Sequence, residues 1–296
     1  MFFGCIGLLV LVTLSLANLN NIKIYTRKYI GEKNYKSLFN ENIENLGECQ
    51  SLTVFKTSVT AFKTDDIKHL PNLEELNANG VNLQILLPGS INDLPSLKYL
   101  HFIDNKLTII PAKVFDNLTI ITLSFRRNQI TSIEANAFKN LTRLEKLDLS
   151  ENQLATISLN WFSDTPNLVE LNLSSNSLSH IQRGVFRNVK NLINIDLSRN
   201  KFQSLEAHFF ATLTQLKFVS FNGNLIDTIH DETFEDQKNL KVLLLISNRV
   251  ECLSENVLRS FAPGSSIFLK RNRIEKDCQE KFKQFLMEHP SIKMHY

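Results

Sequence analysis

The sequence has few of the residues, and none of the motifs, on which catalytic and metal sites depend. Its 296 residues include only nine glycines, with no glycine-rich phosphate loop, no GxSxG nucleophile motif and no HExxH motif. The seven histidines are scattered, and the four cysteines include no CxxC pair of the kind that binds zinc. We therefore expect a protein that is not an enzyme and that uses no metal or other cofactor.

The sequence also lacks a strong excess of charge and any obvious linker. The formal net charge is +3 at pH 7. A nucleic-acid-binding protein normally concentrates basic residues on one face, so we expect no nucleic-acid partner. No tract rich in proline, glycine or serine interrupts the chain, which favours one continuous domain.

What the sequence does have is one pattern written many times, L-x-x-L-x-L-x-x-N-x-L. Its asparagine falls every 24 residues, except that the first interval is 23. Two earlier turns keep the apolar frame but carry Val81 and Thr57 in place of the asparagine. About ten turns are visible, over roughly residues 46–275. The asparagines are Asn105, Asn128, Asn152, Asn176, Asn200, Asn224, Asn248 and Asn272.

The repeated pattern predicts a coil of stacked turns. Leu-x-Leu alternation is typical of a short strand with one buried face, and such a strand needs neighbouring turns to complete its core. Each asparagine suits a buried bend, because its amide can both donate to and accept from backbone groups of the adjacent turn. A phenylalanine follows ten residues later in most turns, which predicts a stacked apolar spine. Its members are Phe115, Phe138, Phe162, Phe186, Phe210 and Phe234, with Leu258 in the next turn.

This pattern resembles the extracellular leucine-rich repeat family in its typical 24-residue class. The chain is similar to insect secreted leucine-rich immune proteins and to Toll-like receptor ectodomains. The resemblance implies an α/β solenoid, a leucine-rich repeat horseshoe with a concave parallel β-sheet, an irregular convex side and a short C-terminal capping helix. It also implies a secreted recognition protein that binds an extracellular protein or glycan ligand in innate immunity. A matrix or cell-adhesion component is the alternative.

The pattern divides the chain into four segments. Residues 1–17 are apolar and end in a small-x-small motif, which predicts a cleaved signal peptide, with a retained anchor as the alternative. Residues 18–48 lie outside the repeat register and predict an N-terminal cap in which NIKIYTRKYI suits a strand. The repeat array follows at 49–275, and 276–296 predict a capping helix and tail, with Asp277 as N-cap. After signal removal we expect a secreted chain with no membrane span.

Covalent features are expected at both ends and along the array. Cys252 and Cys278 lie in consecutive turns at positions that stacking brings together, which predicts a disulfide. Cys49 has no partner in the sequence, so it is either a buried thiol or bonded to another chain. The glycosylation sequons are at Asn117, Asn140 and Asn172, the last of them between inward-facing leucines and so on the open face of its strand.

The outward strand positions vary from turn to turn, and we expect them to form the binding surface. The early turns offer Tyr99, His101 and Ile103, and the middle turns are polar and charged. An apolar group follows and makes up the main predicted site, with Lys270 and Arg271 as its polar rim. The alternative is that the capping segment simply buries this group. The apolar residues are Phe218, Val242, Leu244, Ile246 and Phe268.

Overall fold

The computed structural model describes residues 23–25, 50–55, 59–64, 66–67 and 69–296. The predicted signal peptide, Cys49 and most of the predicted N-terminal cap lie outside the described residues, so the segment boundaries stay a prediction. The contacts divide the chain into two compact units that meet between Leu144 and Glu145. Each unit is described by itself.

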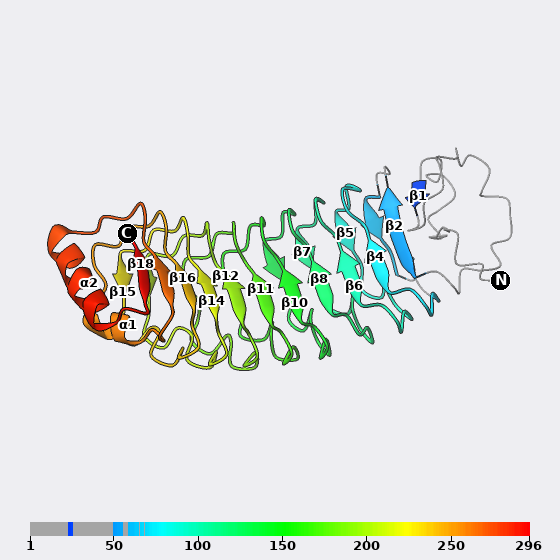
Figure 1. Ribbon diagram of the computed structural model, residues 1–296. Helices are drawn as coiled ribbons and strands as arrows, with labels where there is room; N and C mark the ends of the chain where they lie inside the picture. The colour runs from blue at the N-terminus through cyan, green and yellow to red at the C-terminus, as the bar shows by residue number, and fades with distance from the viewer. Residues whose placement is uncertain (1–22, 26–49, 56–58, 65, 68) are drawn as a thin grey trace. The chain divides into compact units, whose positions relative to one another are not determined.

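Unit 1 contains a sheet in which every second strand of the chain lies beside the previous one (Figure 1). Strands β2, β4, β6 and β8 are parallel and in register, with Leu52, Leu76, Leu100 and Leu123 directly opposite one another. A further strand, β1 (Lys23–Tyr25), pairs antiparallel with β2. The strands are β2 (Ser51–Phe55), β4 (Glu75–Asn77), β6 (Tyr99–His101) and β8 (Thr122–Ser124).

Unit 2 repeats the arrangement with seven parallel strands in the order β10-β11-β12-β14-β16-β17-β18. Partners are 24 residues apart along β10 to β17, so Lys146 lies opposite Glu170 and Phe218 opposite Val242. The strands are β10 (Lys146–Asp148), β11 (Glu170–Asn172), β12 (Asn194–Asp196), β14 (Phe218–Ser220), β16 (Val242–Leu244), β17 (Ser266–Phe268) and β18 (Lys293–His295).

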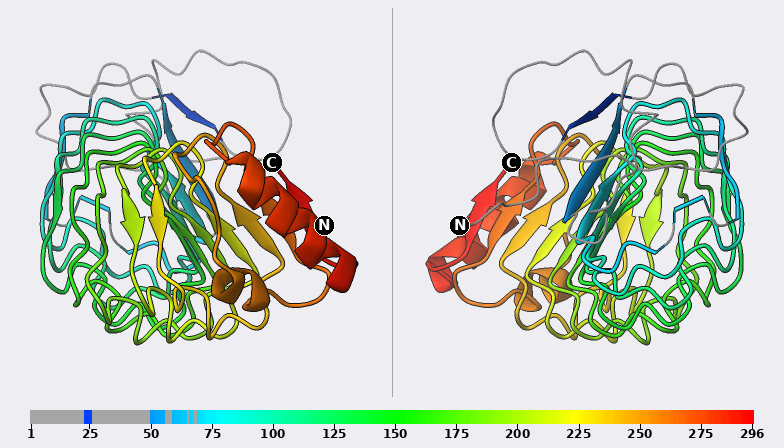
Figure 2. Two further views of the ribbon diagram at one scale, coloured as in Figure 1. Left: turned by 90° about the vertical axis from the view of Figure 1, so that its left-hand side faces the viewer. Right: turned by 90° about the vertical axis from the view of Figure 1, so that its right-hand side faces the viewer.

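Short two-residue strands form a second ladder on the returning limb of some turns. In unit 2, β13 (Ser204–Leu205) pairs with β15 (Thr228–Ile229), and Figure 2 shows this yellow-green pair on the opposite side of the coil from the main sheet. In unit 1, β3 (Ala61–Phe62) pairs with β5 (Ile85–Leu86), and β7 (Ile109–Ile110) pairs with β9 (Ser132–Ile133). Each unit is therefore a parallel solenoid, as the repeat predicts.

The core of each unit lies between the main sheet and the returning limb. In the main sheet of unit 2, the central residue of each strand from β10 to β17 points inward and is at most 2% exposed, as Leu171, Val219 and Ile267 illustrate. The predicted phenylalanine spine is confirmed, since every member from Phe115 to Phe234 is buried, as is Leu258. Rings of adjacent turns stack on one another, with centroids 6.1 Å apart for Phe162 and Phe186.

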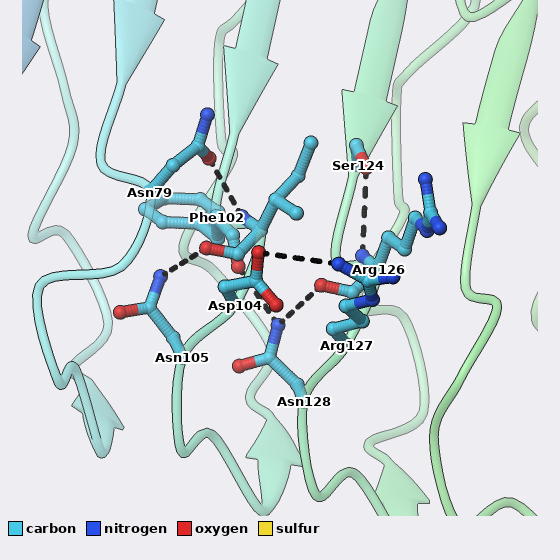
Figure 3. Close-up of polar contacts among 9 residues, drawn as sticks. Asn79, Phe102, Asp104, Asn105, Ser124, Arg126, Arg127 and Asn128 are labelled. Atoms are coloured by element: carbon cyan, nitrogen blue, oxygen red, sulfur yellow. Dashed lines mark hydrogen bonds and ion pairs between the residues drawn. The ribbon is translucent and has the colours of Figure 1, made fainter.

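The asparagine column ties each turn to the one before it. The Asn176 side-chain oxygen accepts from the Leu154 N–H at 2.9 Å, and its amide nitrogen donates to the carbonyls of Leu149 at 3.0 Å and Leu173 at 3.1 Å. In unit 1, Asn128 donates to Phe102 O in the same way (Figure 3). The seven asparagines from 105 to 248 are all buried. The predicted role of this residue as a buried bend is confirmed.

The residue just before each asparagine has a left-handed backbone. Eight turns share this conformation, with φ between 53° and 67°, and Gly80, which precedes Val81 in an earlier turn, has a φ of 64°. Gly80 and Gly223 adopt it without steric cost, whereas Arg127, Arg199 and Arg271 adopt it with a Cβ atom. The hydrogen bonds of the following asparagine hold the chain in this turn, so the strand exits that carry an asparagine share one conformation.

The C-terminal end of unit 2 differs from the prediction in three ways. The capping helix α2 (Lys276–Glu288) is present and covers the end of the unit (Figures 1 and 2), but its N-cap is Glu275 rather than Asp277. Asp277 lies in the first helical turn instead, where a carboxylate is favoured by the helix dipole. A short helix α1 (Glu255–Arg259) replaces part of the last returning limb, and the tail forms β18.

Two contacts fasten this end. The structure contains a Cys252–Cys278 disulfide with the Cα atoms 5.5 Å apart, which ties α2 to the preceding turn. Cys278, Phe282 and Phe285 form the buried face of α2, and the Phe282 ring lies 5.3 Å from that of Tyr296. The cap therefore closes the core through both a covalent bond and apolar packing.

Asn200→Ala should lower the free energy of unfolding by about 1–3 kcal/mol, because it leaves the buried Leu178 N–H without its partner and removes one of the two amides that donate to Leu173 C=O. The matched control is Gln203→Ala, which removes an exposed side chain from the same turn. Urea denaturation of both variants checks this. Equal stability of the two variants would contradict the role given to the asparagine column.

Cys278→Ser should lower the free energy of unfolding by roughly 2–4 kcal/mol, because the 26-residue loop closed by the disulfide is released. Denaturation of the wild type under reducing conditions should give the same loss, since both treatments break the same bond. A reductant effect that persists in the variant would show that another disulfide stabilises the chain.

Candidate ligand-binding surface

The candidate surface is the open face of the main sheet, formed by the strand residues that alternate with the buried ones. On β16, for example, Leu243 is 1% exposed while Val242 and Leu244 on either side are half-buried and reach the open face. Because the strands are in register, outward residues of successive turns form columns across the sheet. Side chains 24 residues apart are therefore neighbours.

The five apolar residues predicted from the sequence lie together on this face in unit 2, and we call them the C-terminal patch: Phe218, Val242, Leu244, Ile246 and Phe268. Phe218 lies opposite Val242, and Leu244 lies opposite Phe268. All five are half-buried, whereas the inward residues between them, Val219, Leu243 and Ile267, belong to the core. Sequence reasoning therefore placed them correctly, although their binding role stays a prediction.

The cap borders the C-terminal patch rather than burying it. Strand β18 extends the sheet beyond β17, and the His295 ring stacks on Phe268 with centroids 4.5 Å apart and an angle of 12° between the planes. Lys270 and Arg271 are exposed at the end of β17, as expected for a polar rim. Because the patch keeps part of its surface open, the alternative in which the cap covers it completely is not what the structure contains.

The earlier strands of unit 2 carry a polar face held by local hydrogen bonds. The side-chain oxygens of Asp148, Asn172 and Asp196 each accept from the backbone N–H two residues later, at 2.9, 3.0 and 2.9 Å. Lys146 also pairs with Glu170 across two strands at 3.0 Å. These contacts order the side chains before any ligand arrives. Asn172 is half-buried in this row, so its sequon lies on the open face as expected.

Unit 1 places Tyr99 and His101 together on the open face of β6. Tyr99 is 40% exposed, and His101 is half-buried. Burial lowers the pKa of His101 below its ordinary value of 6.5, and the nearby Glu75 carboxylate partly offsets this. Glu75 in turn accepts from Ser51 Oγ at 3.2 Å and from Asn77 Nδ2 at 2.8 Å.

An ion pair lies at the exit from the unit 1 strands. Arg127 Nη1 is 3.7 Å from Asp104 Oδ2, and both residues occupy the left-handed position before an asparagine (Figure 3). Ile103, the third residue predicted in this area, donates its N–H to Asn79 Oδ1 at 2.7 Å. Polar contacts between turns thus continue beyond the strands.

Sequence reasoning missed a second exposed apolar group, on the returning limb of unit 1. Ile85 is 50% exposed, Leu87 40% and Ile109 37%. Ile85 and Ile109 occupy equivalent positions in successive turns, four residues after Val81 and Asn105. The signal was therefore present in the sequence, in the apolar residue that both turns place at the same point of the returning limb.

Three further features concern metal binding, membrane insertion and glycosylation. In the part of the chain that the structure describes, no three His, Cys, Asp or Glu side chains gather as a metal site requires. Among the same residues, none of the helices is long and apolar enough to cross a membrane. Asn117 and Asn140 are exposed on the returning limb with φ of 61° at both, and their glycosylation stays a prediction.

Comparison with known proteins agrees with this architecture. The family model of the BspA type leucine rich repeat region matches residues 108–241 in six copies. Residues 108–241 of the chain therefore form a leucine-rich repeat region.

A solved structure shows the same fold at a larger scale. A chain of the glycosylated Toll–Spatzle complex, described as a molecular hub in Drosophila development and innate immunity, matches with a TM-score of 0.66 and 22% identity. The match covers 73% of this leucine-rich repeat chain and 31% of that chain. The protein thus spans less than a third of the length of that neighbour and resembles Toll-like receptor ectodomains in fold. A search of curated proteins finds no match.

His101→Gln should make the stability of unit 1 less dependent on pH. Because burial lowers the pKa of His101 in the folded chain, the unfolded chain binds its proton first, and wild-type stability should fall as the pH drops below about 6.5. Denaturation at pH 7.5 and at more acidic values checks this, with exposed His180→Gln as control. An unchanged pH dependence in His101→Gln would contradict the assignment.

Proposed function

We propose that this leucine-rich repeat protein is a secreted, non-catalytic recognition protein that binds a protein ligand through the open face of unit 2. The observation that carries the proposal is the C-terminal patch, in which four apolar side chains lie at outward positions on three neighbouring strands and the fifth, Ile246, lies two residues beyond the end of β16. Part of each of these side chains stays open to water and is not covered by the core of the described residues. A contiguous apolar group of this kind on a water-facing sheet usually marks an interface.

The composition of the patch suits a binding site for polypeptide. Phe218 and Phe268 supply the large aromatic surfaces on which interface energy tends to concentrate, and exposed Lys270 and Arg271 form a polar border. The sheet beneath is fixed by the core and the asparagine column, so the side chains are held in place before binding. A rigid scaffold with exchangeable outward residues is how repeat arrays achieve specificity.

An extracellular location and a role in innate immunity complete the proposal. The Cys252–Cys278 disulfide favours an oxidising compartment, in keeping with the predicted signal peptide at 1–17 and the sequons. The fold is shared with a chain of a Toll–Spatzle complex described as a hub of innate immunity. The proposal also includes a glycan as an alternative ligand of this surface and, separately, a second chain bonded through Cys49.

Leu244→Asp and Phe268→Asp should abolish partner binding while secretion and thermal stability stay near wild type. Both side chains are half-buried, so a carboxylate there can reach water but disrupts an apolar contact with a ligand. The matched control is Met287→Asp on α2, where an 80% exposed apolar side chain lies away from the sheet. Affinity purification from extracellular fluid, followed by binding measurements with the purified partner, checks this.

The possible results separate the alternatives. Loss of secretion in both variants would show that the patch is structural core, because a buried charge costs several kcal/mol. Normal folding with unchanged binding would contradict the proposal and place the site elsewhere. A protein found on microbial surfaces or in soluble fluid would favour immunity, whereas retention in insoluble extracellular fractions would favour a matrix role.

A further inference from the structure

Acidic and basic residues lie on different parts of the open face of unit 2. Each strand and its exit lie in a stretch of seven residues, and these stretches form two groups. The first group belongs to β10, β11 and β12 and comprises residues 145–151, 169–175 and 193–199. The second group belongs to β14, β16 and β17 and comprises residues 217–223, 241–247 and 265–271. Residues 292–296 complete the second group with β18. The two groups differ in the sign of their charge, although they share one sheet.

In the group around the C-terminal patch, every charged side chain is basic. Its five cationic side chains are all exposed, and it has no aspartate or glutamate. Lys217 and Lys241 precede the strands, and the others lie at the ends of β17 and β18. Within the part of the chain that the structure describes, none of the five takes part in an ion pair. These residues are Lys217, Lys241, Lys270, Arg271 and Lys293.

The group formed by β10, β11 and β12 has the opposite sign. It contains five carboxylates and two cationic residues, one of which, Lys146, is paired with Glu170 at 3.0 Å. Asp148 and Asp196 accept hydrogen bonds from the backbone N–H groups of Ser150 and Ser198, which hold both carboxylates in place on the open face. The carboxylates are Glu145, Asp148, Glu151, Glu170 and Asp196.

We propose that the C-terminal patch binds a protein segment in which apolar side chains alternate with aspartate and glutamate. This inference rests on the proposed function and specifies the chemistry of the ligand. The apolar side chains of the segment would contact Leu244 and Phe268, while its carboxylates face the surrounding lysines and Arg271. Complementary charge at the border of an apolar contact accelerates association and excludes ligands of the wrong sign.

This distribution of charge favours a polypeptide over an anionic lipid surface. A membrane of uniform negative charge that approaches the basic group would also meet the carboxylates of β10, β11 and β12 on the same sheet. A protein segment can end, or change its charge, before it reaches them. The apolar residues of the patch are moreover half-buried in a continuous row of strands, which offers side chains a surface to pack against.

The test is a peptide-display selection with the secreted full chain as bait. A random library of short peptides is enriched on the wild type and counter-selected on Leu244→Asp, so that only peptides dependent on the patch remain. We expect these peptides to combine apolar residues with an excess of Asp and Glu over Lys and Arg. On a Lys217→Glu, Lys270→Glu and Lys293→Glu triple variant, the preference should reverse. Affinity of the acidic peptides should fall roughly tenfold between low and high salt.

Each other result overturns the inference. Peptides that depend on Leu244 but show no acidic preference would contradict the charge argument and leave the proposed function intact. Peptides enriched equally on Leu244→Asp would contradict both. Absence of any patch-dependent peptide would also overturn it, and binding to phosphatidylglycerol vesicles in that case would assign the basic group to anionic lipid. The triple variant must keep wild-type thermal stability, and Lys238→Glu, outside the defined stretches, is the charge-matched control.

Discussion

The hydrogen bonds of the buried asparagine are the constraint on which the rest of the structure depends. Asn200, for example, accepts from Leu178 N–H and donates to Leu173 O, both in the preceding turn. A parallel strand pair cannot be closed by a hairpin, so the turns need such a connection to keep their 24-residue register. Once the register is fixed, inward residues stack into one core and outward residues align in columns.

The same constraint explains how the surface can vary without loss of the fold. The frame uses the asparagine, the inward leucines and the phenylalanine spine, and leaves positions such as 218, 244 and 268 free. In unit 2 the free positions are not used at random, because apolar residues and lysines gather on β14 to β18 while carboxylates gather on β10 to β12. The part of the Leu244 side chain that stays open to water contributes nothing to the core. The arrangement is therefore better explained by recognition than by folding.

Much of this could be predicted from the sequence because the repeat is written in residues that form the structure directly. The strands, the buried asparagines, the spine and the outward placement of Phe268 follow from periodicity. Strand β18 could not be predicted, since KMH carries no leucine pattern and its pairing depends on where α2 returns the chain. The N-cap at Glu275 was missed because Asp277 is the stronger capping residue by type. Partial burial of the patch also depends on neighbouring turns rather than on local sequence.

The most direct test of the account is site-specific photo-crosslinking of the secreted protein in its native fluid. A photoreactive phenylalanine analogue at Ser266 would lie on β17 beside the C-terminal patch, and the same analogue at exposed Thr228 would lie on β15, on the opposite side of the coil. The account predicts a discrete crosslinked partner from position 266 and none from position 228. A partner captured from position 228 alone would contradict it.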